Sequence, residues 1–146
     1  MRMAKLHSDP FSPMFSFPIR VYWEDTDAGG VVYHASYLRF LERARTEWLR
    51  GQGVAQGELR ETHDLIMVVR AMQLDFLKPA KLDDELLATV LLAERRQASF
   101  TVAQELLRGG ECLLRAQVRI ACLNASQFRP RALPDWLAQD SGHGVT

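Results

Sequence analysis

The strongest constraint on the fold is one long helical segment, residues 35–50, which is apolar on more than one side. Its apolar residues recur at steps of four, three and four: Tyr37, Leu41, Ala44 and Trp48. This period predicts an α-helix about 24 Å long at 1.5 Å per residue, ended by Gly51 and Gly53. A helix with such a wide apolar surface is stable only when it is enclosed. The rest of the chain therefore has to wrap around it.

Most segments on both sides of this helix show the period of two that is typical of β-strands, while residues 85–96 form an apolar run that assigns no face. Residues 15–24 alternate between apolar and polar side chains, and a short polar helix or loop is expected at residues 56–63. Four more strands are predicted after it, at 65–77, 85–96, 99–107 and 111–123. Gly109 and Gly110 form a hairpin signal between the last two. The short connections favour an antiparallel meander. The predicted fold class is α+β, with one antiparallel sheet around one helix.

The composition favours a single soluble domain. A chain of 146 residues buries about 70% of its unfolded surface, so we expect a domain at residues 15–134, a flexible extension at 1–14 and a tail at 135–146. The 18 basic and 18 acidic residues cancel, which argues against nucleic acid as a partner. We expect no transmembrane segment, because no stretch reaches the roughly 18 apolar residues needed to span a bilayer. Prolines interrupt the amino terminus, which argues against a secretory signal.

The two cysteines do not predict a disulfide. Cys112 and Cys122 lie on one predicted strand, about 33 Å apart at 3.3 Å per residue, whereas a disulfide needs Cα atoms within about 7 Å. We interpret both as buried core thiols of a protein in the reducing cytoplasm. The sequence has no histidine pair at i, i+4 and no CxxC motif. We therefore expect no metal and no cofactor.

The segment Glu24 to His34, EDTDAGGVVYH, is the best candidate for chemistry. It places two carboxylates, Asp25 and Asp27, and a glycine pair just before the start of the long helix. A helix amino terminus offers unpartnered N–H groups and a positive dipole end, which together suit an oxyanion. A nearby carboxylate can then act on a carbonyl held there. An EF-hand is excluded because position twelve is Ser36, not glutamate. A structural turn with a capping aspartate stays open.

The string DTDAGGVVYHASY, within residues 21–50, closely resembles the opening of the 4-hydroxybenzoyl-CoA thioesterase-like family. The similarity covers about residues 17–134, and the RPRALP run at residues 129–134 resembles the Tol–Pal-associated acyl-CoA thioesterase branch. The resemblance implies a hotdog fold, a homodimer or homotetramer, and hydrolysis of acyl-CoA or of acyl carrier protein thioesters. It also implies a cytoplasmic protein, peripheral to the inner membrane if the Tol–Pal link holds. Trp23 stands where many members have tyrosine.

The resemblance also implies roles for individual residues. Asp27 matches the family's catalytic carboxylate and acts either as a nucleophile or as a general base, while Asp25 supports the turn. The oxyanion donors are expected to be the backbone of Tyr33 and His34. The His34 side chain either contacts substrate and orients Asp27, or merely caps and packs. The substrate-binding residues predicted within this loop are Gly30 and Val31.

Further candidates each have a structural alternative. Arg95, Arg96 and Ser99 either meet the phosphates of coenzyme A or form a solvated strand edge. Tyr33, Tyr37, Trp48 and Met67 either line an acyl pocket or pack in the core. Arg43, Arg45 and Glu47 are expected to be helix-surface charges. Two other functions stay open: a non-catalytic module that binds acyl-CoA or acyl carrier protein in envelope lipid metabolism, and a hotdog hydratase.

Overall fold

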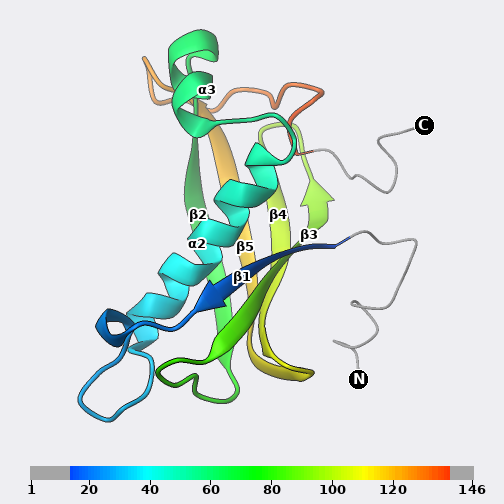
Figure 1. Ribbon diagram of the computed structural model, residues 1–146. Helices are drawn as coiled ribbons and strands as arrows, with labels where there is room; N and C mark the ends of the chain where they lie inside the picture. Colours follow the sequence, from blue (N-terminus) through cyan, green and yellow to red (C-terminus); the bar gives the residue numbers. More distant parts are fainter. Residues whose placement is uncertain (1–13, 139–146) are drawn as a thin grey trace.

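One antiparallel five-stranded sheet curves around the long helix α2, as the computed structural model shows (Figure 1). It describes residues 14–138, so most of the predicted extension and part of the predicted tail lie outside the described residues. The α+β fold class is confirmed. In chain order the elements are β1 (Phe15–Arg20), the 3-10 helix η1 (Trp23–Asp25), α2 (His34–Arg50), α3 (Gln56–His63), β2 (Leu65–Phe76), β3 (Glu85–Arg95), β4 (Ser99–Arg108) and β5 (Glu111–Asn124).

The strand order is β1-β3-β4-β5-β2, with antiparallel neighbours throughout. The predicted meander is therefore right for β3, β4 and β5 and wrong for β2. Instead of pairing with β3, β2 pairs with β5 at one edge of the sheet, and β1 occupies the place beside β3. The long connection at residues 77–84 allows this, because it carries the chain across the sheet instead of closing a hairpin.

The first strand is shorter than predicted. It ends at Arg20, although Val21 still exchanges backbone hydrogen bonds with Asp83 and Asp84 at 3.0 and 2.9 Å. The chain then leaves the sheet because the Asp25 carboxylate accepts the Tyr22 N–H at 2.8 Å and closes η1. Trp23 is consequently 80% exposed instead of lying on the buried face that the alternation predicts.

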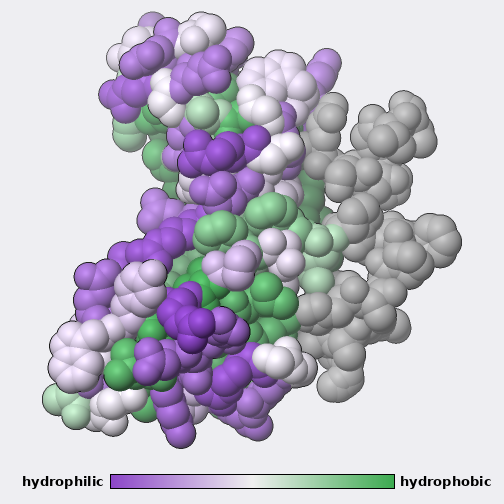
Figure 2. All heavy atoms as spheres, viewed as in Figure 1, coloured by the Kyte–Doolittle hydropathy of each residue, from purple (hydrophilic) through white to green (hydrophobic). Residues whose placement is uncertain are grey.

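Helix α2 forms the centre of the core. Its buried apolar face packs against the inner faces of β1, β3, β4 and β5, and it consists of Tyr37, Phe40, Leu41, Ala44 and Leu49. The helix begins one residue before the predicted start and ends at the predicted residue, Arg50. On the face shown in Figure 2, hydrophobic surface lies in the middle, over and beside β1, while the visible side of α2 and both ends are mainly hydrophilic. In residues 14–138 no helix is long and apolar enough to cross a membrane.

Both cysteines lie on β5, as predicted, and both are free. Cys122 is buried, whereas Cys112 is only partly buried, so the core interpretation is right for the first and only partly right for the second. Burial raises the pKa of the Cys122 thiol, despite the opposing charges of Arg131 and Arg95. Such a thiol stays protonated and is a poor nucleophile.

Candidate active site

Residues 27–31 form a tight hairpin turn immediately before α2. Asp27 N–H donates to the Val31 carbonyl at 2.9 Å, and Gly30 N–H donates to the Asp27 carbonyl at 3.0 Å. Gly30 has φ +84°, the left-handed conformation that ends a three-residue hairpin loop of this kind. The Asp27 side chain is exposed, and its Oδ1 accepts the Gly29 N–H at 2.8 Å. The turn therefore presents one oriented carboxylate to solvent.

Asp25 supports this turn from inside the protein. Asp25 is only 2% exposed, and its carboxylate accepts a hydrogen bond from the Tyr22 N–H. Its backbone carbonyl accepts the Tyr33 N–H at 2.9 Å, which ties η1 to the residue before α2. The predicted division between the two carboxylates thus fits their surroundings, with Asp25 enclosed in backbone contacts and Asp27 facing solvent.

The amino terminus of α2 has open N–H groups, but not all of those predicted. Tyr33 N–H is already bonded to Asp25, so the predicted donor at Tyr33 has an acceptor within the protein. Ser36 N–H donates to the Tyr33 carbonyl at 2.8 Å, and no side chain caps the helix. Among the described residues, the His34 and Ala35 amides have no backbone acceptor. These two amides are the available anion-binding groups of the helix end.

Tyr37 and Ala80 hold the start of α2 in place, and the sequence reasoning missed this pair. Val32 N–H donates to the Ala80 carbonyl at 2.9 Å, and Ala80 N–H donates to the Tyr37 hydroxyl at 3.0 Å. Val31 also forms a bridge with Lys81. The loop that leads into α2 is therefore fastened to the connection between β2 and β3. A buried tyrosine hydroxyl needs a partner, but the sequence does not tell which backbone group it meets.

The other predicted substrate-binding residues divide into two groups. Gly30 and Val31 lie in the turn beside Asp27. Arg95, Arg96 and Ser99 lie where β3 ends and β4 begins, at the opposite end of the sheet from the start of α2 (Figure 1). A single copy of the chain does not bring these two groups together.

The contacts of the second group are structural. Arg95 donates to the carbonyls of Pro134 and Leu137, at 2.6 Å and 3.2 Å, and so fastens the C-terminal segment to the sheet. Arg96 forms an ion pair with Glu94 at 3.0 Å. Ser99 accepts the Arg96 amide through its carbonyl at 2.8 Å. The solvated-edge alternative describes Arg96 better than a phosphate contact does.

Arg45 is buried, which corrects the prediction of a surface charge. Its guanidinium donates to Gln104 Oε1 at 3.1 Å, and Gln104 Nε2 donates to the carbonyls of Leu41 and Thr89 at 3.1 and 3.3 Å. Burial lowers the pKa of the Arg45 guanidinium, and the charge of Glu42 opposes this shift. Arg43 is exposed and Glu47 is partly buried, and Glu47 forms an ion pair of 3.2 Å with Arg50.

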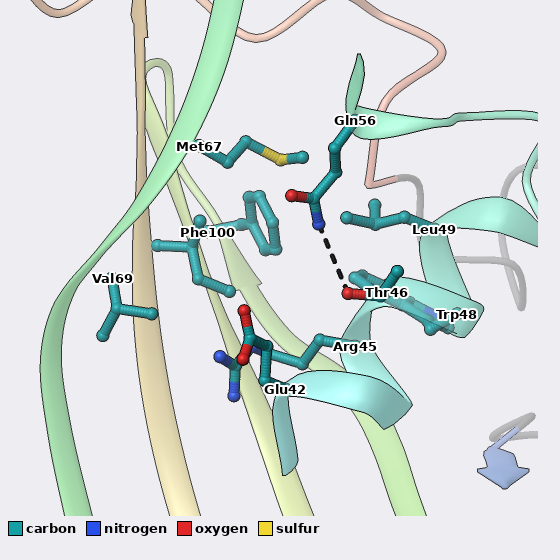
Figure 3. A pocket seen from close by; sticks show the side chains of 10 residues that line it. Glu42, Arg45, Thr46, Trp48, Leu49, Gln56, Met67, Val69 and Phe100 are labelled. Carbon is teal, nitrogen blue, oxygen red and sulfur yellow. Dashed lines mark hydrogen bonds between the residues drawn. The ribbon is translucent and has the colours of Figure 1, made fainter. Parts of the chain in front are cut away.

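A cavity of about 80 Å³ lies beside Arg45, between α2 and β2. Of the four residues considered for an acyl pocket, Trp48 and Met67 line this cavity, whereas Tyr33 and Tyr37 do not. Figure 3 shows Met67 and Phe100 pointing into the cavity from the sheet side and Arg45 from the helix side. At its rim, Gln56 Nε2 donates a long hydrogen bond of 3.5 Å to Thr46 Oγ1.

Gly29→Ala should lower the activity of the Asp27 site. A Cβ atom at Gly29 would lie 3.2 Å from Asp27 Oδ1, so the carboxylate would have to shift by a few tenths of an ångström. Because catalytic groups tolerate little displacement, we expect about a tenfold loss of kcat/KM with an unchanged melting temperature. Gly57→Ala in α3, where a Cβ meets nothing within 4 Å, is the control and should leave kcat/KM at the wild-type value. Equal activity of both variants would contradict the role of this turn.

Tyr37→Phe should weaken the hold on the start of α2. The substitution leaves the buried Ala80 N–H without its acceptor, which costs about 1–3 kcal/mol of the free energy of unfolding. Chemical denaturation measures this loss. We also expect kcat to fall more than KM rises, because the sequence predicts that the start of α2 supplies the oxyanion donors. Tyr22→Phe, at an exposed tyrosine, is the control and should change neither the free energy of unfolding nor kcat. A stable and fully active Tyr37→Phe variant would show that the Tyr37–Ala80 hydrogen bond does not hold the start of α2 in place.

Comparison with known proteins gives a consistent result. Residues 21–140 match the model of the thioesterase-like superfamily. The chain is 47% identical over 120 residues to the acyl-CoA thioesterase YbgC of Haemophilus influenzae, covering 82% of this chain and 88% of that protein. It is 33% identical over 134 residues to the 1,4-dihydroxy-2-naphthoyl-CoA hydrolase of Thermosynechococcus vestitus, covering 86% of this chain and 90% of that one. The crystal structure of a probable thioesterase from Bartonella henselae superposes with a TM-score of 0.80 at 39% identity, over 84% of this chain and 100% of that chain.

Proposed function

Because this chain belongs to the thioesterase-like superfamily, we propose that it hydrolyses acyl-CoA thioesters, with Asp27 as the catalytic carboxylate. One observation carries the assignment of the site. An exposed carboxylate stands on a rigid turn that leads directly into a helix whose amides at His34 and Ala35 lack backbone acceptors. The relatives named as acyl-CoA hydrolases support the reaction.

The chemistry follows from these groups. Asp27 attacks the thioester carbon to form a mixed anhydride, or it removes a proton from a water that attacks the same carbon. Either route places a negative charge on the carbonyl oxygen, which the amides of His34 and Ala35 stabilise. The oxyanion then collapses and the C–S bond breaks. The thiolate takes a proton, from protonated Asp27 on the base route and from solvent on the nucleophile route, so coenzyme A leaves as the thiol. On the nucleophile route a water then hydrolyses the anhydride, which releases the acid and frees Asp27. Gly30 and Val31 line the same turn and contact the substrate.

The His34 side chain is exposed at the start of α2, with its ring centroid 4.5 Å from that of Tyr33. In this proposal the imidazole contacts the substrate beside the oxyanion, and its packing on Tyr33 fixes its direction. The phenol ring of Tyr33 thus orients the His34 imidazole, while the backbone N–H of Tyr33 donates to the Asp25 carbonyl.

A thiol-release assay over a panel of acyl-CoAs tests this function. Release of free coenzyme A at rates that depend on Asp27 supports it. Binding of acyl-CoA without release would instead support the non-catalytic module, and hydration of a 2-enoyl-CoA would support the hydratase. The same assay with acyl-carrier-protein thioesters decides between the two carriers.

We extend the proposal to assembly as a homo-oligomer through β2. This strand is 12 residues long, and within residues 14–138 it pairs on one side only, with β5. Phe76 and Leu77 at its end are 52% and 47% exposed. A long edge strand with apolar residues is a site for pairing with another chain. Light scattering that gives the mass of a dimer or tetramer supports this, and a monomer mass at assay concentrations refutes it.

The resemblance to the Tol–Pal-associated branch supports a cytoplasmic protein that works in envelope lipid metabolism and is peripheral to the inner membrane. Cell fractionation tests this part. If the protein is found only in the soluble fraction, under conditions that keep peripheral proteins on the membrane, the proposed membrane association is wrong. The proposed hydrolase activity does not depend on this result.

A further inference from the structure

The Asp27 turn and the connection between β2 and β3 together form a small sheet of three short segments beside the start of α2. Thr26 forms an antiparallel bridge with Val32, and Val31 forms one with Lys81, so the two loops lie side by side (Figure 1). The Asp27 N–H donates to the Val31 carbonyl at 2.9 Å, which places Asp27 opposite Val31. Asp27, Val31 and Lys81 therefore form one row across this small sheet.

This row lies on the solvent side. Residues that stand opposite each other in antiparallel segments share a face, and successive residues along a segment alternate between faces. Val32 and Ala80, the chain neighbours of the row, are 4% and 0% exposed and lie on the core side. Asp27 and Lys81 are exposed, with the half-buried Val31 between them. The Asp27 carboxylate and the Lys81 side chain therefore stand on the same side of the site.

The backbone that carries Lys81 is fixed on both sides. The Lys81 N–H donates to the Asp84 carboxylate at 2.8 Å, and the Asp84 N–H donates to the Lys81 carbonyl at 3.1 Å. On the other side, the Ala80 N–H donates to the Tyr37 hydroxyl at 3.0 Å. Only the lysine stem is therefore left to adjust its position.

Lys81 also differs from its neighbours in having no acidic partner. Three other cations at this end of the sheet form ion pairs, namely Arg20 with Glu85, Lys78 with Glu111, and Arg108 with Asp84. Lys81 forms no ion pair within residues 14–138. Its charge acts on Asp84, but less than that of Arg108, which is bonded to this carboxylate at 2.7 Å. The Lys81 ammonium is therefore available to an anionic ligand.

Resting on the proposed hydrolysis of thioesters, we infer that Lys81 binds the phosphate at the far end of the pantetheine arm. Coenzyme A and the prosthetic group of acyl carrier protein both carry this phosphate. The thioester lies at the Asp27 turn, and the arm crosses Val31 and ends at the Lys81 ammonium. Lysine is well suited to this role, since its ammonium is a point charge that binds phosphate without a fixed geometry.

The lengths of the two partners agree. Two steps of about 5 Å separate the Cβ atoms of Asp27 and Lys81, and an extended lysine stem adds about 5 Å. The pantetheine arm has about a dozen covalent bonds between sulfur and phosphorus, which extend for about 15 Å at about 1.2 Å per bond. An extended arm therefore brings its phosphate to the ammonium while the thioester stays at Asp27.

Lys81→Gln tests the inference. We expect the KM for acyl-CoA to rise about five- to tenfold, because a charged contact with the phosphate is lost. The kcat value should stay within about twofold, and the melting temperature should not change. Lys81→Arg keeps the charge and should restore KM to within about twofold of the wild type. Lys78→Gln, in the same connection, is the matched control and should leave both kinetic constants unchanged.

Truncated substrates identify the group that Lys81 contacts. S-acyl-phosphopantetheine carries the shared phosphate and should show the same rise in KM as acyl-CoA. S-acyl-pantetheine lacks this phosphate and should give equal KM values for the wild type and Lys81→Gln. An equal rise with S-acyl-pantetheine, or a rise with acyl-CoA alone, would overturn the inference. The wild-type kcat/KM values for acyl-CoA and for an acyl-carrier-protein thioester show which carrier supplies the phosphate.

A binding measurement separates this inference from the hydrolase assignment. Calorimetry with coenzyme A needs no turnover, and we expect its Kd to rise about five- to tenfold in Lys81→Gln and to stay unchanged in Lys78→Gln. The rise should shrink at high salt, because salt screens exposed charges. If the wild type releases no thiol, the hydrolase assignment fails, while the Kd values still decide the role of Lys81. An unchanged Kd in Lys81→Gln would overturn the inference.

Discussion

Asp27→Asn should abolish thioester hydrolysis, with a loss of kcat on the order of 10³-fold or more, as for other nucleophiles and bases that act in the transition state. The amide has the shape of the carboxylate and keeps an oxygen that accepts the Gly29 N–H, so the turn is retained. What disappears is the negative charge that attacks carbon or takes a proton from water. Thiol release under saturating acyl-CoA measures the effect.

Asp83→Asn is the matched control for this experiment. Asp83 is also exposed, lies in the nearby connection between β2 and β3, and has φ +72°, a conformation that asparagine adopts readily. This variant should keep wild-type kcat, and both variants should keep the wild-type melting temperature. A fully active Asp27→Asn would remove Asp27 from the mechanism, whereas equal losses in both variants would indicate a general charge effect.

Gln104→Leu should produce the largest loss of stability. Gln104 is fully buried and joins Arg45 on α2 to the carbonyls of Leu41 and Thr89. Leucine would leave a buried guanidinium and two buried carbonyls without this partner. We expect the free energy of unfolding to fall by about 3 kcal/mol. For a chain of this size that corresponds to about 10 °C in the melting temperature, measured by calorimetry or circular dichroism.

Gln117→Leu supplies the comparison, because Gln117 occupies the neighbouring strand β5 but is exposed. Its substitution should change the free energy of unfolding by no more than about 0.5 kcal/mol. A similarly small effect at Gln104 would mean that water or local rearrangement satisfies the buried groups.

Local patterns predicted most of the elements. The 3.6-residue period sets α2 to within one residue at its start, and the predicted strands match β2 to β5 at their starts and to within one residue at their ends. Gly109 and Gly110 mark the β4–β5 turn correctly, with φ +62° at Gly109. These helix, strand and turn bounds depend on the order of residues that are close together in the chain, which can be read directly from the sequence.

The errors concern hydrogen-bond partners that the periodic pattern does not display, some of them distant in sequence and others only a few residues away. Nothing near Arg45 indicates that Gln104, 59 residues away, accepts its hydrogen bond, so a charge on a helix was assigned to solvent. Trp23 continues the alternation of β1, but the Asp25 carboxylate turns the backbone out of the sheet. The Tyr33 amide was expected to be open, and only the fold shows that it meets Asp25.

The contacts of Arg95 with Pro134 and Leu137 have a practical consequence. The 11 residues of β3 extend for about 33 Å at 3.3 Å per residue, and they separate this fastening from Asp27, the proposed catalytic carboxylate. Anchoring chemistry for immobilisation, or a dye for single-molecule work, can therefore be attached near Ala132, which is exposed, without crowding the Asp27 turn. Because of this separation, thermal stability can be changed at the Arg95 end of the molecule and substrate selectivity at the Asp27 end.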